Sequence, residues 1–240
     1  VLGAAIVAGC GGSDATAGAG GGGGAGGSGS TGTTGTGGSS STGTGTGQCA
    51  EIPEETAGPY PDKTGMLDNA AFHRKDVTEG KTGLPLALAF TVVDSAQGCA
   101  PVEGAVVEIW HCDKDGLYSG YNASNNAGQA GLTYLRGIQV TDSNGRVNFT
   151  TIYPGWYAGR ITHIHFQVYP NADTNTTATA TSQLAFPQDV TRAVYDSSQY
   201  AARGQNTSVA DFAHDNVFSD GVKYQLAKVK GTVRYGEIEV

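Results

Sequence analysis

Short runs rich in β-branched and aromatic residues recur from residue 84 onward, and they constrain the fold of this chain most strongly. Turn-forming stretches such as "DSAQG", "DKDG" and "DSNG" separate them. Strands are expected at 84–94, 104–113, 146–153, 163–169 and 231–240. Helix signals are few, and one short helix is expected around 187–195. The sequence therefore predicts an all-β protein, a β-sandwich with few short helices.

The chain divides by composition into three parts. Residues 11–48 are almost entirely Gly, Ser, Thr and Ala. Such a segment cannot bury enough apolar surface to offset the entropy of ordering it, so a disordered linker is expected. Residues 49–240 remain as one folded domain. Residues 1–10, "VLGAAIVAGC", look like the truncated end of a secretory signal. Their "VAGC" ending resembles a lipobox with Cys10 as the lipidated residue; ordinary signal cleavage beside an incidental cysteine is the alternative.

Charge and cysteine content limit the possible functions. The net charge is −8 with only 14 lysines and arginines, and no basic run occurs. Nucleic-acid binding is therefore not expected, because it depends on clustered cations. No apolar run approaches the length of a transmembrane helix. Export would permit disulfides. We expect Cys49 to pair with Cys99 or Cys112, and the sequence leaves open which of the two it is.

The densest chemistry of the chain lies in "YPGWYAGRITHIHFQV", residues 153–168. On a strand, His163 and His165 share one face, while Ile164 and Phe166 share the core face. Two imidazoles roughly 7 Å apart at their backbones can converge on one metal ion. A surface or hydrogen-bonded histidine pair is the plain alternative. A cupin site would need a nearby glutamate, which "HFQVYPN" lacks, and neither H-E-x-x-H nor a zinc-type cysteine pair occurs.

Tyrosines are the nearest additional donors, Tyr157 most obviously. A phenolate is a hard, anionic oxygen donor, and its unperturbed pKa is about 10. Only a strongly Lewis-acidic ion would keep it deprotonated at neutral pH. A set of tyrosines and histidines therefore favours non-haem Fe(III) over Zn(II), Mg(II) or Ca(II).

Three stretches together, "EIWHCDKDGLYSGY", "LRGIQVTDSNGRVNFTTIYPGWY" and "GRITHIHF", resemble the intradiol ring-cleavage dioxygenases. This is the family of catechol 1,2-dioxygenase and protocatechuate 3,4-dioxygenase. The upstream "PEETAGPY" resembles the segment at the entry to that family's substrate pocket. The resemblance covers most of residues 50–195 and is closest to the exported, single-domain members. It implies a prealbumin-like sandwich that binds Fe(III).

The resemblance also implies roles for individual residues. The metal ligands would be Tyr118, Tyr157, His163 and His165, and Tyr157 would also act as the general base. Arg160 would bind the substrate and stabilise charge on its ring, Gln183 would hold that arginine, and Tyr60 would line the pocket. Tyr121 is interpreted as pocket lining or structure, and His111 as structural.

The implied reaction inserts both atoms of O2 into a small catechol-type substrate and cleaves the ring between the hydroxyl-bearing carbons to a muconate. Ala158 and Gly159 follow the second ligand tyrosine where the protocatechuate enzymes have Pro-Trp, so a more open pocket is expected. An inactive surface binding module, and a metal-dependent hydrolase or copper protein, are the alternatives. The export signals predict a bacterial lipoprotein in the cell envelope or outside the cell. The oligomeric state stays open.

Overall fold

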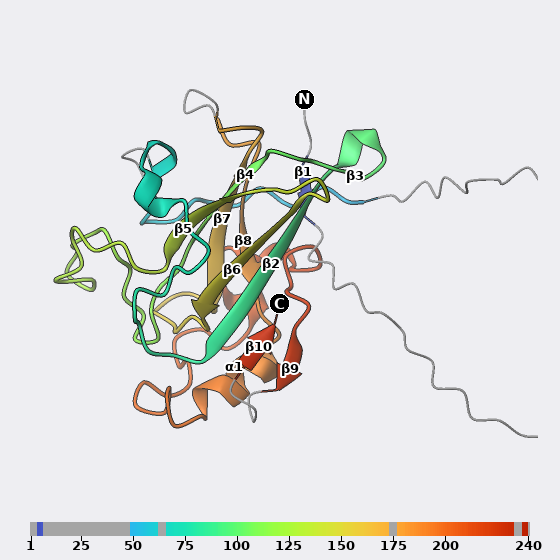
Figure 1. Ribbon diagram of the computed structural model, residues 1–240. Coiled ribbons are helices and arrows are strands. Elements are labelled where there is room, and N and C mark those ends of the chain that lie inside the picture. Colours follow the sequence, from blue (N-terminus) through green and yellow to red (C-terminus); the bar gives the residue numbers. More distant parts are fainter. Residues whose placement is uncertain (1–3, 7–48, 62–65, 173–176, 233–236, 240) are drawn as a thin grey trace, which may run out of the picture.

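Two β-sheets face each other in the computed structural model, which describes residues 4–6, 49–61, 66–172, 177–232 and 237–239 (Figure 1). The first sheet contains β1 (Ala4–Ile6), β2 (Pro85–Asp94), β3 (Ala100–Pro101), β6 (Arg146–Ile152), β9 (Lys230–Thr232) and β10 (Glu237–Glu239). The second runs in the order β5 (Arg136–Val140), β4 (Val106–Trp110), β7 (His163–Tyr169) and β8 (Ala180–Ala185). The predicted all-β sandwich is confirmed.

Helical structure is limited to short segments in the part of the chain that the structure describes. The predicted helix is present as α1 (Gln188–Tyr195), which lies with the C-terminal strands at the lower end of the sandwich in Figure 1. The other segments are 3-10 turns at Met66–Asp68, Ala70–Phe72, Ser95–Gln97, Phe212–His214 and Phe218–Asp220. Among the described residues, no helix combines the length and apolar character that spanning a bilayer requires.

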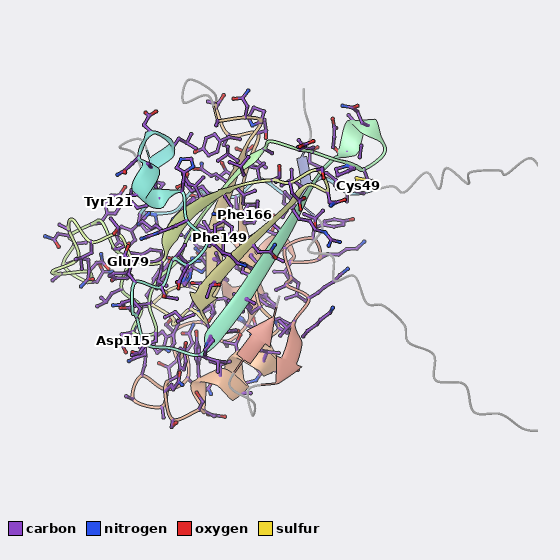
Figure 2. The ribbon with its side chains drawn as sticks, viewed as in Figure 1. Cys49, Glu79, Asp115, Tyr121, Phe149 and Phe166 are labelled. Atoms are coloured by element: carbon purple, nitrogen blue, oxygen red, sulfur yellow. A yellow bond between two sulfur atoms is a disulfide. The ribbon has the colours of Figure 1, made fainter. Side chains whose placement is uncertain are left out.

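The core lies between the two sheets because apolar side chains alternate along their strands. Leu86, Leu88 and Phe90 of β2 are almost completely buried. Phe149 and Phe166, labelled near the centre of Figure 2, come from opposite sheets. The Phe90 ring centroid lies 6.4 Å from that of Phe149 and 5.3 Å from that of Phe166. Each fully buried ring contributes roughly 1.5–3 kcal/mol of hydrophobic stabilisation.

Strand register aligns three side chains in one row on the outer face of the second sheet. Trp110 of β4 pairs with His165 of β7, which in turn pairs with Gln183 of β8. These three residues therefore lie side by side across three strands and on one face. Ile164 and Phe166, the neighbours of the two histidines in β7, belong to the core instead. The predicted division of β7 into a core face and a histidine face is confirmed.

The end of the chain differs from the prediction of one strand over 231–240, which was wrong. Two short strands occur instead: β9 and β10 pair in antiparallel fashion, and β10 also adds in parallel to β2. The edge strands β5 and β8 were not predicted. Their partners β4 and β7 are the apolar central strands of the sheet.

Disulfide pairing is decided by the structure. Cys49 is bonded to Cys99, with a Cα–Cα distance of 5.8 Å, and Cys112 is free and buried. Residues 4–6 of the predicted signal segment form β1, which pairs with β2. Cys10 and the predicted linker, 11–48, lie outside the described residues. The linker and the lipid anchor therefore stay predictions.

Candidate active site

Four side chains from separate parts of the chain converge on the outer face of β7. His163 and His165 come from β7, Tyr118 from the loop after β4, and Tyr157 from the corner before β7. The Nε2 atom of His163 lies 3.1 Å from Nε2 of His165, 3.2 Å from the Tyr157 hydroxyl and 3.4 Å from the Tyr118 hydroxyl. The structure therefore brings together all four residues that the resemblance implied as metal ligands.

The hydrogen bonds of His163 fix where its lone pair points. Its Nδ1 lies 2.5 Å from the carbonyl oxygen of Ile161, so Nδ1 carries the proton and donates it. The lone pair of Nε2 then points toward the other three candidate metal ligands, His165, Tyr157 and Tyr118. Among the described residues, the buried Nδ1 of His165 has no hydrogen-bond partner. The ring of His165 is held by stacking on Trp110, with centroids 5.0 Å apart and planes inclined by 3°.

Burial keeps all four donors neutral in the absence of an ion. It lowers the pKa of His163 to about 3 and that of His165 well below its usual value, with neighbouring positive groups adding to the effect. Burial also raises the pKa of Tyr118 well above its usual value and that of Tyr157 to about 12, although Arg160 opposes the shift in Tyr157. The imidazoles are therefore ready to donate, whereas the phenols give up their protons only to a strong Lewis acid.

These residues fit a bound Fe(III) ion. Two ligands at right angles on one ion, each at a typical metal–nitrogen distance, lie about 3 Å apart. The spacing between the donors in this site is similar. Nitrogen from two neutral imidazoles and hard oxygen from two phenols make a donor set suited to iron. No group of three or more His, Cys, Asp and Glu suited to a metal occurs in the described part of the chain. A metal site there depends on the tyrosines.

Tyr118 is held by an asparagine that sequence reasoning missed. The side-chain oxygen of Asn126 accepts from the backbone N–H of Tyr118 at 2.7 Å, and its amide nitrogen donates to the Tyr118 carbonyl at 2.8 Å. The same nitrogen donates to the carbonyl of Tyr121. Asn126 is 1% exposed, so these bonds are shielded from water. Only the asparagine-rich composition of the loop hinted at such a role.

The N-terminal segment of the domain packs directly on a predicted ligand. Gly58, from the "TAGPY" stretch, has a φ of +73°, and a Cβ added there would lie 2.6 Å from Cε1 of His165. Nearby, the carbonyl of Thr56 accepts from Nε2 of Gln183 at 2.8 Å. The backbone of this segment therefore touches both His165 and Gln183, and glycine is required for the close approach.

We expect Gly58→Ala to weaken iron binding by about 10–100-fold, the range typical of changes in the residues that support metal ligands. The added methyl group must displace the imidazole of His165. Gly80→Ala is the matched control, because Gly80 has a φ of +75° with nothing within 4 Å of an added Cβ. Iron affinity of both variants can be measured by competition with a chelator. Equal affinities would show that the contact at Gly58 does not position His165.

Arg160 lies beside the donor set and is held by two polar partners. Its Nη2 donates to Oε1 of Gln183 at 2.6 Å, and its Nε donates to Oδ2 of Asp215 at 3.0 Å. Its guanidinium also lies 5.6 Å from the ring centroid of Phe218. Gln183 was predicted to hold this arginine, and the two side chains are in contact. Asp215 was missed, because it lies far along the chain in a stretch with no recognisable motif.

Tyr60 and Tyr121 form an aromatic wall next to Tyr118. The ring centroid of Tyr60 lies 5.0 Å from that of Tyr118 and 5.4 Å from that of Tyr121. The Tyr121 hydroxyl donates to the carbonyl of Pro61. Figure 2 labels Tyr121 on the left of the view. Tyr60 and Tyr157 are partly exposed, whereas Tyr118 is buried. The open side of the site is therefore the side on which Tyr60 and Tyr157 lie.

His111 lies apart from the four converging donors. It is fully buried, with Nε2 at 2.7 Å from the Thr151 hydroxyl and Nδ1 at 2.9 Å from the Cys112 carbonyl. Burial lowers its pKa to about 4. Nε2 thus bonds to Thr151 of β6 in the first sheet, while Nδ1 bonds to the backbone of the adjacent Cys112. These contacts agree with the structural role predicted for His111.

The sandwich that carries this cluster of two tyrosines, two histidines and an arginine is similar to a known class of protein. The family model described as Dioxygenase, Dioxygenase_C, matches residues 56–228. The structure is similar to an intradiol ring-cleavage dioxygenase from Tetranychus urticae, with a TM-score of 0.66 and 27% identity over 80% of this chain and 91% of that one. The chain belongs to the intradiol ring-cleavage dioxygenase family, which is a family of oxidoreductases.

Curated relatives are similar over a shorter stretch. Catechol 1,2-dioxygenase from Acinetobacter baylyi is 33% identical over 93 residues, which cover 39% of this chain and 28% of the relative. Chlorocatechol 1,2-dioxygenase from Pseudomonas putida is 32% identical over 83 residues, covering 27% of this chain and 30% of the relative. The chain thus matches less than a third of the length of either relative.

Proposed function

We propose that this protein is a non-haem Fe(III) dioxygenase that cleaves small catechol-type substrates between the two hydroxyl-bearing carbons, using both atoms of O2. The observation that carries the proposal is the convergence of the Tyr118, Tyr157 and His165 donors on Nε2 of His163, within 3.4 Å. Membership of the family supports the same reaction. The curated relatives that it resembles are named for catechol and chlorocatechol, which supports an ortho-diphenol as the substrate.

Residues of this chain would transfer a proton, stabilise charge on the substrate and exclude water. Iron(III), when bound, supplies a Lewis acid that lowers the pKa of the oxygens it contacts and draws electron density from an electron-rich ring. Tyr157 is partly exposed, so its oxygen can reach an entering substrate, and as the phenolate that it would become on binding iron it could accept a proton from a substrate hydroxyl. Arg160 keeps its charge and can stabilise negative charge that develops on the ring. Trp110 and Tyr118, both buried, keep water from the inner side of the site.

The visible absorption spectrum of the iron-loaded protein tests the proposed metal site. Phenolate bound to Fe(III) gives a broad charge-transfer band in the visible range, so the protein should be deeply coloured, and anaerobic addition of catechol should change the band. Tyr118→Phe should weaken the band, because one of the two phenolates is lost. A folded protein that stays colourless with stoichiometric iron would contradict the assignment. Loss of turnover with an intact band would instead favour an inactive binding module.

The substrate preference should be broad for substituted catechols. Ala158 and Gly159 are both exposed, and nothing lies within 4 Å of a Cβ added to Gly159. A bulky wall is therefore missing after Tyr157, and each methylene-sized pocket contact discriminates by only about 1–3 kcal/mol. We expect comparable kcat/KM for catechol and for its alkyl or hydroxy derivatives, without a strong preference for protocatechuate. A preference for protocatechuate above about a hundredfold, roughly 2.7 kcal/mol, would contradict this expectation.

We also propose that the protein is exported and anchored to a membrane through Cys10, on the basis of the "VAGC" sequence and the Gly/Ser/Thr-rich residues that follow. Expressed behind a secretory signal, the chain should fractionate with membranes, and Cys10→Ala should release it or block its processing. Identical soluble behaviour of both forms in fractionated cells would count against the anchor. The Cys49–Cys99 disulfide is compatible with export.

A further inference from the structure

We propose that Asp215 is the positioning residue that fixes the guanidinium of Arg160 in this site. The catalytic role of this positioning rests on the proposed function, whereas the contact between Arg160 and Asp215 does not depend on it. Asp215 lies 55 residues beyond Arg160 in the chain, on the segment between the turns Phe212–His214 and Phe218–Asp220. Its side chain is completely buried. This later segment thereby contacts Arg160 through the Asp215 carboxylate.

The Asp215 carboxylate joins the Arg160 region to this later segment. Oδ2 accepts from Nε of Arg160 at 3.0 Å and from the backbone N–H of Ile161 at 2.7 Å. Oδ1 accepts from the backbone N–H groups of Val217 at 2.9 Å and Phe218 at 3.1 Å. The carboxylate therefore has donors on both sides, and its own position is fixed by three backbone groups that cannot rotate away.

Two anchors leave the guanidinium little freedom. Gln183 binds Nη2 from one side, and Gln183 is itself held by the carbonyl of Thr56. Asp215 binds Nε from the other side. Phe218, which directly follows Val217, has its ring centroid 5.6 Å from the guanidinium carbon of Arg160 and 6.5 Å from the His163 ring centroid. The segment therefore positions Arg160 against the histidine side of the site.

A purely stabilising role explains this arrangement poorly. Arg160 and Asp215 have side chains that are 9% and 0% exposed. Burial of an ion pair costs desolvation energy that the attraction between the charges roughly offsets, so such a pair adds little to stability compared with apolar residues of similar size. A charged group that must act on a substrate does gain from being held in one orientation before the substrate arrives. We therefore assign the ion pair the role of holding the Arg160 guanidinium in one orientation.

The test uses the full chain loaded with iron, with Asp215→Asn as the variant. Asparagine keeps one side-chain oxygen for the backbone N–H groups of Val217 and Phe218. It loses the charge and places an amide NH2 where Oδ2 accepted from Arg160 and Ile161. We expect iron content and the visible band to be retained, anaerobic catechol affinity to change by less than about threefold, and kcat to fall by more than about thirtyfold, roughly 2 kcal/mol. The control is Asp94→Asn, which removes a buried carboxylate that caps the turn Ser95–Gln97 in the first sheet. It should leave kcat within about twofold of the wild type.

A double-mutant cycle separates positioning from general damage to the fold. In an Arg160→Leu background, Asp215→Asn should lower kcat by less than about threefold further, because its effect acts through the arginine. Full, independent loss in that background would overturn the proposal, as would an Asp215→Asn variant that folds, binds iron and keeps kcat within about threefold of the wild type.

A measurement on the wild-type chain keeps the proposal testable if Asp215→Asn does not fold. With labelled arginine and diamagnetic Ga(III) in place of iron, the Nε–H signal of Arg160, assigned by its absence in Arg160→Lys, should exchange slowly with water. Fast exchange would overturn the contact. If the wild type cleaves no catechol, the proposed function fails, while slow exchange would still support the Arg160–Asp215 contact.

Discussion

His163→Ala should lower iron affinity by more than about a hundredfold and remove ring cleavage. His163 is the common neighbour of the other three donors, and its Nε2 lone pair is directed at them by the bond from Nδ1 to the Ile161 carbonyl. Loss of a ligand should cost more than the 10–100-fold typical of changes in the residues that support ligands. Iron content after dialysis and kcat with catechol measure the effect.

His111→Ala is the matched control for that variant. His111 is as buried as His163, but both of its ring nitrogens bond to Thr151 and Cys112, away from the donor set. This variant should lose stability, because it leaves a buried hydroxyl without its partner. It should still bind one iron for each folded molecule. Full iron occupancy in His163→Ala would remove His163 from the ligand set.

Gly155→Ala should destabilise the domain by about 1–3 kcal/mol or more, the cost typical of overpacking. A Cβ at Gly155 would lie 2.3 Å from the carbonyl oxygen of Lys114 and 2.6 Å from that of Asp113, both of which are backbone atoms. The corner that carries Tyr157 must then move away from the loop that carries Tyr118. In a domain of this size Tm should fall by roughly 2–4 °C for each kcal/mol, and iron affinity should fall as well.

Gly159→Ala provides the comparison within the same corner. Gly159 has a φ of +90° with nothing within 4 Å of an added Cβ, so its substitution should cost only the backbone strain, about 1–2 kcal/mol. Thermal unfolding of both variants measures the difference. If Gly159→Ala proves more destabilising than Gly155→Ala, the close approach of the corner to Lys114 is not what requires glycine.

The sequence predicted those strands whose pattern is strongly apolar. The runs at 84–94 and 146–153 alternate between core and solvent, and they form β2 and β6 (Figure 1). β5 and β8 have the sequences "RGIQV" and "ATSQLA", which contain few β-branched or aromatic residues. They are strands because the neighbouring strands β4 and β7 offer them hydrogen-bonding edges. Such pairing depends on the tertiary structure and leaves little trace in local sequence.

The site followed a similar division. The tyrosines, the histidines and Arg160 all lie in short recognisable motifs, so the sequence alone could predict them as site residues. Asn126 acts through the backbone N–H of Tyr118, 8 residues away in the same loop, and Asp215 through that of Ile161, 54 residues away. Both side chains become important only once the fold gives the backbone of their partners its final path. His214, directly before Asp215, is exposed and draws attention to the surface, whereas Asp215 itself is buried.

Identification of the product formed from catechol under ¹⁸O2 tests the proposed function most directly. The iron-loaded full chain should consume O2 and form a muconate, with the ring opened between the two hydroxyl-bearing carbons and an ¹⁸O atom in each new carboxylate. Formation of a semialdehyde, from cleavage beside the hydroxyl groups, would contradict the proposed reaction. So would a folded, iron-loaded protein that consumes no O2 with any member of a panel of catechols.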